Sequence, residues 1–179
     1  VKATSNLQKD IETAKFVLLG IKPQILNDVL LQISQESVII SVLAGVTINT
    51  LSQKINTSNI TRVMPNIASA VNEGLTGVIF SDSIQIKQKE KVLEILNSSG
   101  KTIVLASEDQ MNRFTLLSGS LIGIIGFWEH HFENFLNLKN QKILIKILYE
   151  LGAEKFFTKE ESKTIIDQTF IGYKKIRID

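Results

Sequence analysis

Three apolar runs near the start of the sequence each end in residues that could hold a ligand. Gly20 and Lys22 follow the first run, Ala44 and Gly45 follow the second, and Asn66 follows the third. Small residues let a ligand approach the backbone, and an asparagine side chain both donates and accepts hydrogen bonds. Each residue alone could be ordinary turn chemistry, but together they favour a ligand-binding cleft.

The elements that must position these residues are predicted from the hydrophobic pattern. Residues 16–21 and 38–42 are almost wholly apolar, which is typical of strands buried on both faces of a parallel sheet, and residues 60–63 supply a third strand that begins and ends with an apolar residue. Pro23 opens one intervening helix, and Thr47 caps the next. The face of the first helix is predicted from residues at helical spacing: Leu26, Val29, Leu30 and Ile33. Right-handed crossovers would make the three strands parallel, so their carboxyl ends, where ligands of such sheets bind, share one edge.

The pattern changes from strands to helices near residue 106. Further strands are predicted at 74–80 and 101–105, with a helix at about 84–98 between them. Ser107 and Gln110 then fit a capping box. Everything beyond is predicted to be helical: a long helix to about residue 138, a second at 141–151 and a third from Lys159 onward. The fold class is therefore α/β, with a sheet domain at 1–106 and a helical domain at 107–179.

Glycines recur in the first of these helices, at Gly119, Gly123 and Gly126. A glycine inside a helix costs about 1 kcal/mol relative to alanine. The spacing indicates either close packing against another helix or chain, or a helix that is broken here.

Four of these segments also carry a resemblance to a known family. Residues 20–23, 41–47, 62–66 and 72–74 resemble, in order and spacing, the "VKP", "SxxAGV(S/T)", "R-x-MPN" and "xEG" segments of pyrroline-5-carboxylate reductases. The match continues through residues 117–120. The resemblance implies a truncated Rossmann-like, dinucleotide-binding domain followed by an incomplete helical domain for dimerisation and substrate binding.

The resemblance implies an NADP-dependent oxidoreductase acting on a C=N bond. Its reaction would reduce 1-pyrroline-5-carboxylate to L-proline with a hydride from NADPH or NADH, in proline biosynthesis. The residues it implies around the cofactor are Gly20, Ile21, Lys22, Pro23, Val42, Leu43, Ala44 and Asn66. Those it implies on the substrate side are Asn66, Ser118, Gly119 and Ser120. No catalytic residue is assigned, and for Lys22 the alternative is a solvated lysine at a strand end.

Three departures from the family pattern lead us to expect impaired activity. The chain holds no GxGxxG turn, no Gly-Pro-Ala after Ser120, and no SPGGTT-like segment. Orientation of the reacting groups can lower a barrier by about 7 to 11 kcal/mol, so the loss of segments that position the cofactor and substrate is expected to slow the reaction. Two alternatives stay open: a non-catalytic remnant that serves as a binding or dimerisation module, and a related reductase with another imine or carbonyl substrate.

The composition of the chain argues against some classes of binding partner. The 179-residue chain is 44% hydrophobic and 21% charged, as globular proteins are, and its net charge of +2 predicts no nucleic-acid or membrane partner. It has no cysteine, which excludes disulfides and thiolate metal sites. The apolar run at 116–128 is too short to span a bilayer, and no secretory leader is recognised, so we expect a cytoplasmic protein. By the family resemblance it would be a homo-oligomer, joined through the helical domain.

Two other kinds of site, a metal site and a serine nucleophile, have candidate residues in the sequence. Possible metal ligands gather in one stretch: Glu129, His130, His131 and Glu133. Adjacent histidines point to different sides of a helix and no further ligand cluster occurs, so no metal site is expected. Ser118 or Ser120 could act as a nucleophile beside a histidine, but neither lies in a GxSxG elbow, and no such role is expected.

Overall fold

The fold is described from a computed structural model of the chain, which describes residues 7–26, 33–124 and 157–177. The chain forms two compact units. Unit 1 comprises residues 1–64 and 78–94, and unit 2 comprises residues 65–77 and 95–179. This division follows packing rather than chain order, and the domain boundary at residue 106 stays a prediction.

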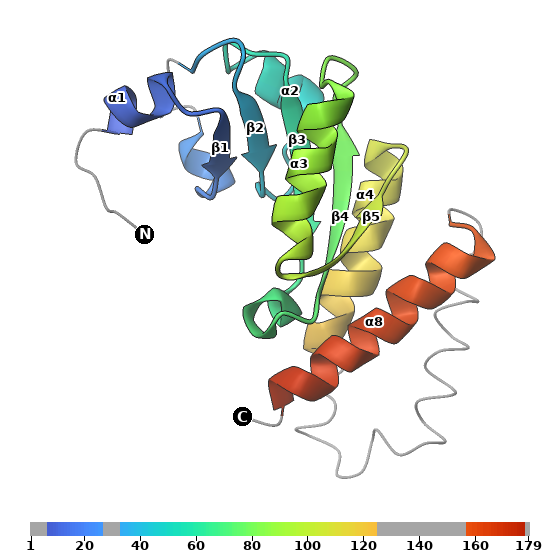
Figure 1. Cartoon of the computed structure of the whole chain (residues 1–179). Coiled ribbons are helices and arrows are strands. Elements are labelled where there is room, and N and C mark those ends of the chain that lie inside the picture. The colour runs from blue at the N-terminus through green and yellow to red at the C-terminus, as the bar shows by residue number, and fades with distance from the viewer. Residues whose placement is uncertain (1–6, 27–32, 125–156, 178–179) are drawn as a thin grey trace, which may run out of the picture. The chain divides into compact units, whose positions relative to one another are not determined.

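Five strands are hydrogen-bonded in the order β1-β2-β3-β4-β5. They are β1 (Phe16–Leu19), β2 (Val38–Ser41), β3 (Ile60–Pro65), β4 (Gly74–Phe80) and β5 (Gly100–Val104). β1 pairs with β2 in parallel, with Leu19 opposite Ser41, and β2 pairs in parallel with β3. The predicted parallel arrangement of the first three strands is confirmed (Figure 1).

β4 runs against β3, whereas the sequence predicted a parallel sheet domain without this reversal. The backbone N–H of Ser81, just after β4, donates to the carbonyl of Ile60 at the start of β3, over 2.9 Å. The end of β4 therefore lies beside the beginning of β3 (Figure 1). The cause is the link between them: it holds only the short 3-10 helix η2 (Ile67–Val71), whereas a parallel crossover needs about a dozen residues or more. The α/β class with a mostly parallel sheet is nonetheless confirmed.

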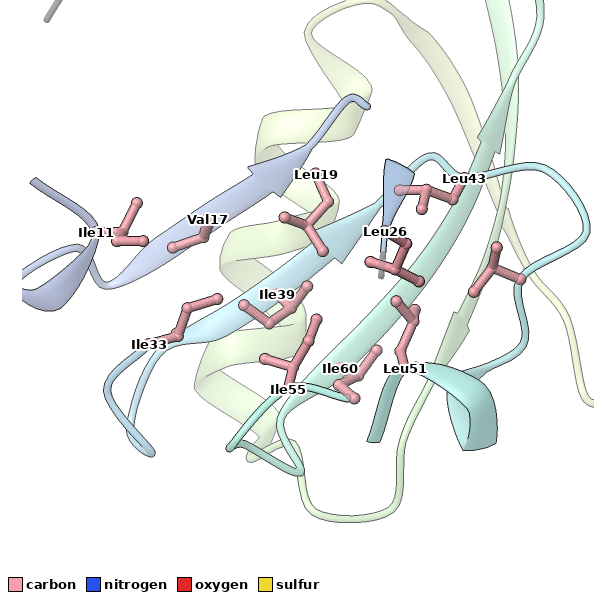
Figure 2. Packing of buried hydrophobic residues seen from close by; sticks show 11 residues of the cluster. Ile11, Val17, Leu19, Leu26, Ile33, Ile39, Leu43, Leu51, Ile55 and Ile60 are labelled. Atoms are coloured by element: carbon pink, nitrogen blue, oxygen red, sulfur yellow. The ribbon is translucent and has the colours of Figure 1, made fainter. Parts of the chain in front are cut away.

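The core of unit 1 lies on one face of the first three strands (Figure 2). Its buried members are Ile11, Val17, Leu19, Leu26, Ile33, Ile39, Leu43, Val46, Leu51, Ile55 and Ile60. Burying a side chain of this size contributes about 1.5 to 3 kcal/mol. Every residue of β2 is buried, as predicted. β1 differs from the prediction of a strand buried on both faces, because Val17 and Leu19 are buried but Leu18 is 64% exposed.

Short helical segments lie before and between the first three strands of unit 1 in the chain. α1 (Leu7–Glu12) precedes β1, and Pro23 opens only a 3-10 turn, η1 (Pro23–Ile25). The remainder of the predicted helix, with Val29 and Leu30, lies outside the described residues. α2 (Ile48–Ser52) begins as predicted, because the hydroxyl of Thr47 accepts from the backbone N–H of Thr50 over 3.1 Å.

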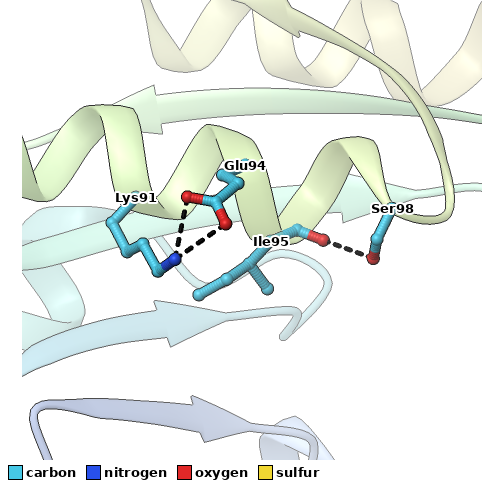
Figure 3. Close-up of polar contacts among 4 residues, drawn as sticks. All are labelled: Lys91, Glu94, Ile95 and Ser98. Atoms are coloured by element: carbon cyan, nitrogen blue, oxygen red, sulfur yellow. Dashed lines mark hydrogen bonds and ion pairs between the residues drawn. The ribbon is translucent and has the colours of Figure 1, made fainter.

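The next helix along the chain is α3 (Ile86–Asn97). On its exposed face, Lys91 and Glu94 form an ion pair at 2.7 Å (Figure 3). An exposed pair of this kind contributes only a few tenths of a kcal/mol. In unit 2, α4 (Glu108–Phe114) has the predicted cap, since the Ser107 hydroxyl accepts from Gln110 N–H over 3.2 Å. The chain then passes into a π-helical segment, η3 (Thr115–Ser120).

α8 (Lys159–Arg177) confirms the third predicted helix and packs against η2 and η3. The predicted helix at 141–151 lies outside the described residues, as do Gly126 and residues 125–138 of the long helix. Close packing at Gly119 and Gly123 is not found within the described part of this chain, because a Cβ at either position would meet no atom within 4 Å. Packing against a second chain stays a prediction.

Candidate functional site

In unit 1, the ends of β1 and β2 bring two of the predicted segments together. Leu19 and Ser41 are register partners, and the backbone N–H of Val42 donates to the carbonyl of Leu19 over 3.2 Å. Residues 20–23 and 42–45 therefore leave the sheet side by side. This is the edge at which ligands of parallel sheets bind.

The backbone at this edge is accessible. Gly20, Ala44 and Gly45 are exposed, and a Cβ added at either glycine would meet no atom within 4 Å. Gly45 has a φ of 73°, a left-handed backbone conformation that residues other than glycine and asparagine seldom adopt. Lys22 is exposed where η1 begins, and supplies the positive charge of the edge. Small exposed residues beside one cation suit a ligand that carries a phosphate or another anionic group.

Leu43 has a different place from its neighbours. Its side chain is 1% exposed and belongs to the core cluster of unit 1. Its backbone N–H donates to the hydroxyl of Ser41 over 3.4 Å, and its carbonyl accepts from Val46 over 3.4 Å. Leu43 therefore shapes the turn, and any contact with a ligand would come from its backbone. Ile21, Pro23 and Val42 are each half-buried.

In unit 2, the structure brings Asn66 and Ser118 together. Asn66 Nδ2 donates to the carbonyl of Ser118 over 3.2 Å, and Asn66 Oδ1 accepts from the backbone N–H of Leu75 over 3.1 Å. Ser118 is 1% exposed, and its hydroxyl donates to the carbonyl of Phe114 over 2.9 Å. Gly119 is half-buried and Ser120 is exposed. Of the three η3 residues assigned to the substrate side, these last two are open to a ligand.

The π-helical geometry of η3 was not predicted. Leu121 N–H donates to the carbonyl of Leu116, five residues earlier. Such segments are rare and often accompany functional sites. The carbonyl of Ser118 also accepts from a side chain, and a side chain that reaches into the hydrogen-bond ladder is one known cause of helix distortion. The sequence around Gly119 and Ser120 does not by itself indicate that the helix changes to π-helical hydrogen bonding here.

Glu73, within the "xEG" segment, is tied to α8. Lys175 Nζ lies 2.8 Å from Glu73 Oε1, and Gln168 Nε2 donates to the Glu73 carbonyl over 3.3 Å. The hydrogen bond and the charge of Lys175 hold the pKa of Glu73 below its ordinary value. Partners so far apart in sequence could not be found from local spacing. The glutamate thus has a structural partner in unit 2.

Arg62 of the "R-x-MPN" segment also lacked a predicted role. It is 2% exposed within β3 of unit 1. A side chain buried so deeply is out of reach of a ligand in solvent, so Arg62 is not assigned to the site.

A cavity of about 690 Å³ lies at the opposite edge of the sheet in unit 1. Lys15, Ser37 and Asn59, which precede β1, β2 and β3, are among the residues that line it. Because parallel sheets bind ligands at the carboxyl ends of their strands, the candidate site stays at the edge with Gly20 and Ala44.

Within residues 7–26, 33–124 and 157–177, no three acidic, histidine or cysteine side chains are grouped to hold a metal ion. The four possible ligands at 129–133 lie outside these ranges. No described helix combines the length and apolar character needed to cross a bilayer.

Comparison with known proteins gives the family context. No protein-family model matches the chain. It is 30% identical over 161 residues to the pyrroline-5-carboxylate reductase of Staphylococcus epidermidis, a match that covers 87% of this chain and 55% of that protein. The chain thus spans about half the length of the curated relatives it matches.

Solved structures of the same family share the fold. The pyrroline-5-carboxylate reductase of Coxiella burnetii matches with a TM-score of 0.64 and 25% identity, over 94% of this chain and 59% of that one. The Plasmodium falciparum enzyme, solved with NADP bound, matches in fold with a TM-score of 0.54 and 24% identity, over 87% of this chain and 57% of that one. The resemblance is therefore confirmed, and the chain is homologous over most of its length to the pyrroline-5-carboxylate reductase family.

Proposed function

We propose that this chain serves the reduction of 1-pyrroline-5-carboxylate to L-proline, with unit 1 holding a nicotinamide dinucleotide and unit 2 contributing to the substrate side. The observation that carries the proposal is the register of β1 and β2, which sets the two family segments at 20–23 and 42–45 beside each other. The homology to pyrroline-5-carboxylate reductases supports the assignment of this edge to the cofactor.

The residues of unit 1 fit such a cofactor. Gly20, Ala44 and Gly45 leave backbone exposed, and at the two glycines there is open space where a side chain would otherwise stand. Lys22 supplies a cation for a phosphate group, and Ile21 and Val42 offer apolar surface for a ring. When bound, the nicotinamide supplies a hydride. The role of the protein is to bind the cofactor and to fix the orientation of its nicotinamide ring.

The proposal of NADP rather than NAD as the cofactor is based on a single solved relative. The solved relative from Plasmodium falciparum holds NADP, so NADPH is the first reductant to test and NADH the comparison. On the substrate side, Gly119 and Ser120 present backbone and a hydroxyl to the ligand. We further propose a role in proline biosynthesis and a homodimer formed through the helical region, as the family resemblance implies, together with a cytoplasmic location.

Calorimetric titration of the folded chain with NADPH tests the proposal. We expect binding in the micromolar range, and a loss of roughly tenfold in affinity in Lys22→Met, since a hydrogen bond to a charged group contributes about 1.5 kcal/mol or more. Lys87→Met, on an exposed position of α3, is the matched control and should leave the affinity unchanged.

Absence of binding by a folded sample would overturn the cofactor assignment. The homologous chain would then be better explained as a non-catalytic binding or dimerisation module. Binding that persists in Lys22→Met would remove Lys22 from the site and leave it a solvated lysine. If NADPH binds, oxidation of NADPH in the presence of pyrroline-5-carboxylate measures whether this chain turns over.

A further inference from the structure

The side chain of Asn66 is fully built into unit 2. It is 6% exposed, directly after β3 and at the start of η2. Its amide nitrogen donates to Ser118 in η3 and its oxygen accepts from Leu75 in β4. One carboxamide thus joins three segments, two of which are 52 residues apart in the chain.

The two neighbours make opposite demands on this side chain. The Ser118 carbonyl can only accept a hydrogen bond, and the Leu75 N–H can only donate one. A carboxamide meets both demands from adjacent atoms, whereas an ionised carboxylate has no proton to donate. Asparagine is therefore specified by the geometry of its own fold, independently of any ligand.

The segment held by this contact is the π-helical turn η3. Ser118 lies within it, buried, and is followed by Gly119 and Ser120, the two residues of η3 assigned to the substrate side that are open to a ligand. A shift of the Ser118 carbonyl would carry these two residues with it, because they follow it directly in the backbone. Small displacements of positioning groups are enough to weaken binding and catalysis substantially.

We propose that Asn66 is a positioning residue: its carboxamide fixes the π-helical turn that presents Gly119 and Ser120, instead of contacting substrate or cofactor itself. This inference rests on the proposed function, and it replaces the direct contact that the sequence resemblance implied for Asn66. It assigns the effect of Asn66 to the substrate side of unit 2.

Asn66→Asp is the test, because it keeps the size of the side chain and the acceptor for Leu75 but loses the donor for Ser118. Two variants serve as controls. Asn112→Asp makes the same chemical change at an exposed position of α4, and Ile165→Val weakens the packing of a buried residue of α8 without touching the contact.

Amide hydrogen exchange is measured first, since it needs no ligand. In Asn66→Asp, exchange at residues 119–121 should become roughly tenfold faster, as expected when a buried hydrogen bond is lost, and stay unchanged in Asn112→Asp. Unchanged exchange in Asn66→Asp would overturn the inference. If this variant does not fold, Asn66→Ser is used, whose smaller side chain leaves room for a bridging water, with the same expected direction.

Calorimetric binding then separates positioning from direct contact. Affinity for L-proline, the product, should fall roughly tenfold in Asn66→Asp while affinity for NADPH is unchanged, and Ile165→Val should leave both unchanged. Equal loss of NADPH affinity would mean that Asn66 contacts the cofactor, and the inference would fail. If the wild-type chain binds neither ligand, the proposed function fails, and the exchange result still decides whether Asn66 holds the turn.

Discussion

Replacing Gly172 by alanine should destabilise unit 2, because at this glycine α8 lies against η2 with no room for a Cβ. A Cβ at Gly172 would lie 2.5 Å from the Cβ of Ala68 and 3.1 Å from the carbonyl oxygen of Glu73. Carbon atoms in favourable contact are about 3.5 to 4.0 Å apart. Ala68 is 0% exposed and its Cβ is fixed to the backbone, so it cannot rotate away. The helix or η2 would have to move.

Two effects of opposite sign set the magnitude. Alanine is favoured over glycine inside a helix by about 1 kcal/mol. Forcing a methyl group into a packed contact costs about 1 to 3 kcal/mol, and two close neighbours that cannot rotate place this site at the upper end. The net expectation for Gly172→Ala is a loss of about 1 to 2 kcal/mol. At Gly123, where a Cβ meets no atom within 4 Å, only the helix term applies, and alanine should add up to about 1 kcal/mol.

Urea unfolding of the two variants, followed by circular dichroism, tests this difference in sign. The midpoint should fall in Gly172→Ala and rise in Gly123→Ala, with the slope of each transition unchanged. A Gly172→Ala variant as stable as the wild type would refute the packing of α8 on η2. A loss of stability in Gly123→Ala would indicate that this glycine packs against something, such as a second copy of the chain.

Two further predictions concern the turn after β2 and the contacts of α8. Gly45→Ala should lower the free energy of unfolding by about 1 kcal/mol, because φ is 73° at this position. Gly45→Asn should lower it less, since asparagine tolerates this conformation. Thermal unfolding of the two variants measures the difference. The pKa of Glu73 is lowered by Lys175, so this pair stabilises the fold above the ordinary carboxyl value of 4.5, and that contribution is lost as pH falls through the folded pKa. Stability measured from neutral to acidic pH should therefore fall less steeply in Lys175→Met; equal slopes would argue against the pair.

Much of the local structure could be predicted because its causes are local. Thr47 and Ser107 cap helices through the backbone N–H three residues later, so the sequence contains both partners. The parallel direction of β1, β2 and β3 followed from the two intervening segments. The reversal of β4 could also have been predicted, because the eight residues from 66 to 73 are too few for a parallel crossover.

Other features depend on partners that sequence spacing does not reveal. Asn66 meets Ser118, and Glu73 meets Lys175, across separations of 52 and 102 residues. Glycine spacing was also misleading: Gly119 and Gly123 face open space among the described residues, while the tight contact falls at Gly172, which no pattern singled out. Leu43 matched the family segment, yet its side chain belongs to the core.

Nuclear magnetic resonance can show whether a nicotinamide dinucleotide binds at the carboxyl ends of β1 and β2. Backbone amide signals of the labelled chain would be followed during a titration with NADPH. We expect the largest shifts in unit 1 to fall on residues 20–22 and 42–45. Shifts confined to the residues around the opposite cavity, such as Lys15, Ser37 and Asn59, or the absence of any shift in a folded sample, would contradict this expectation.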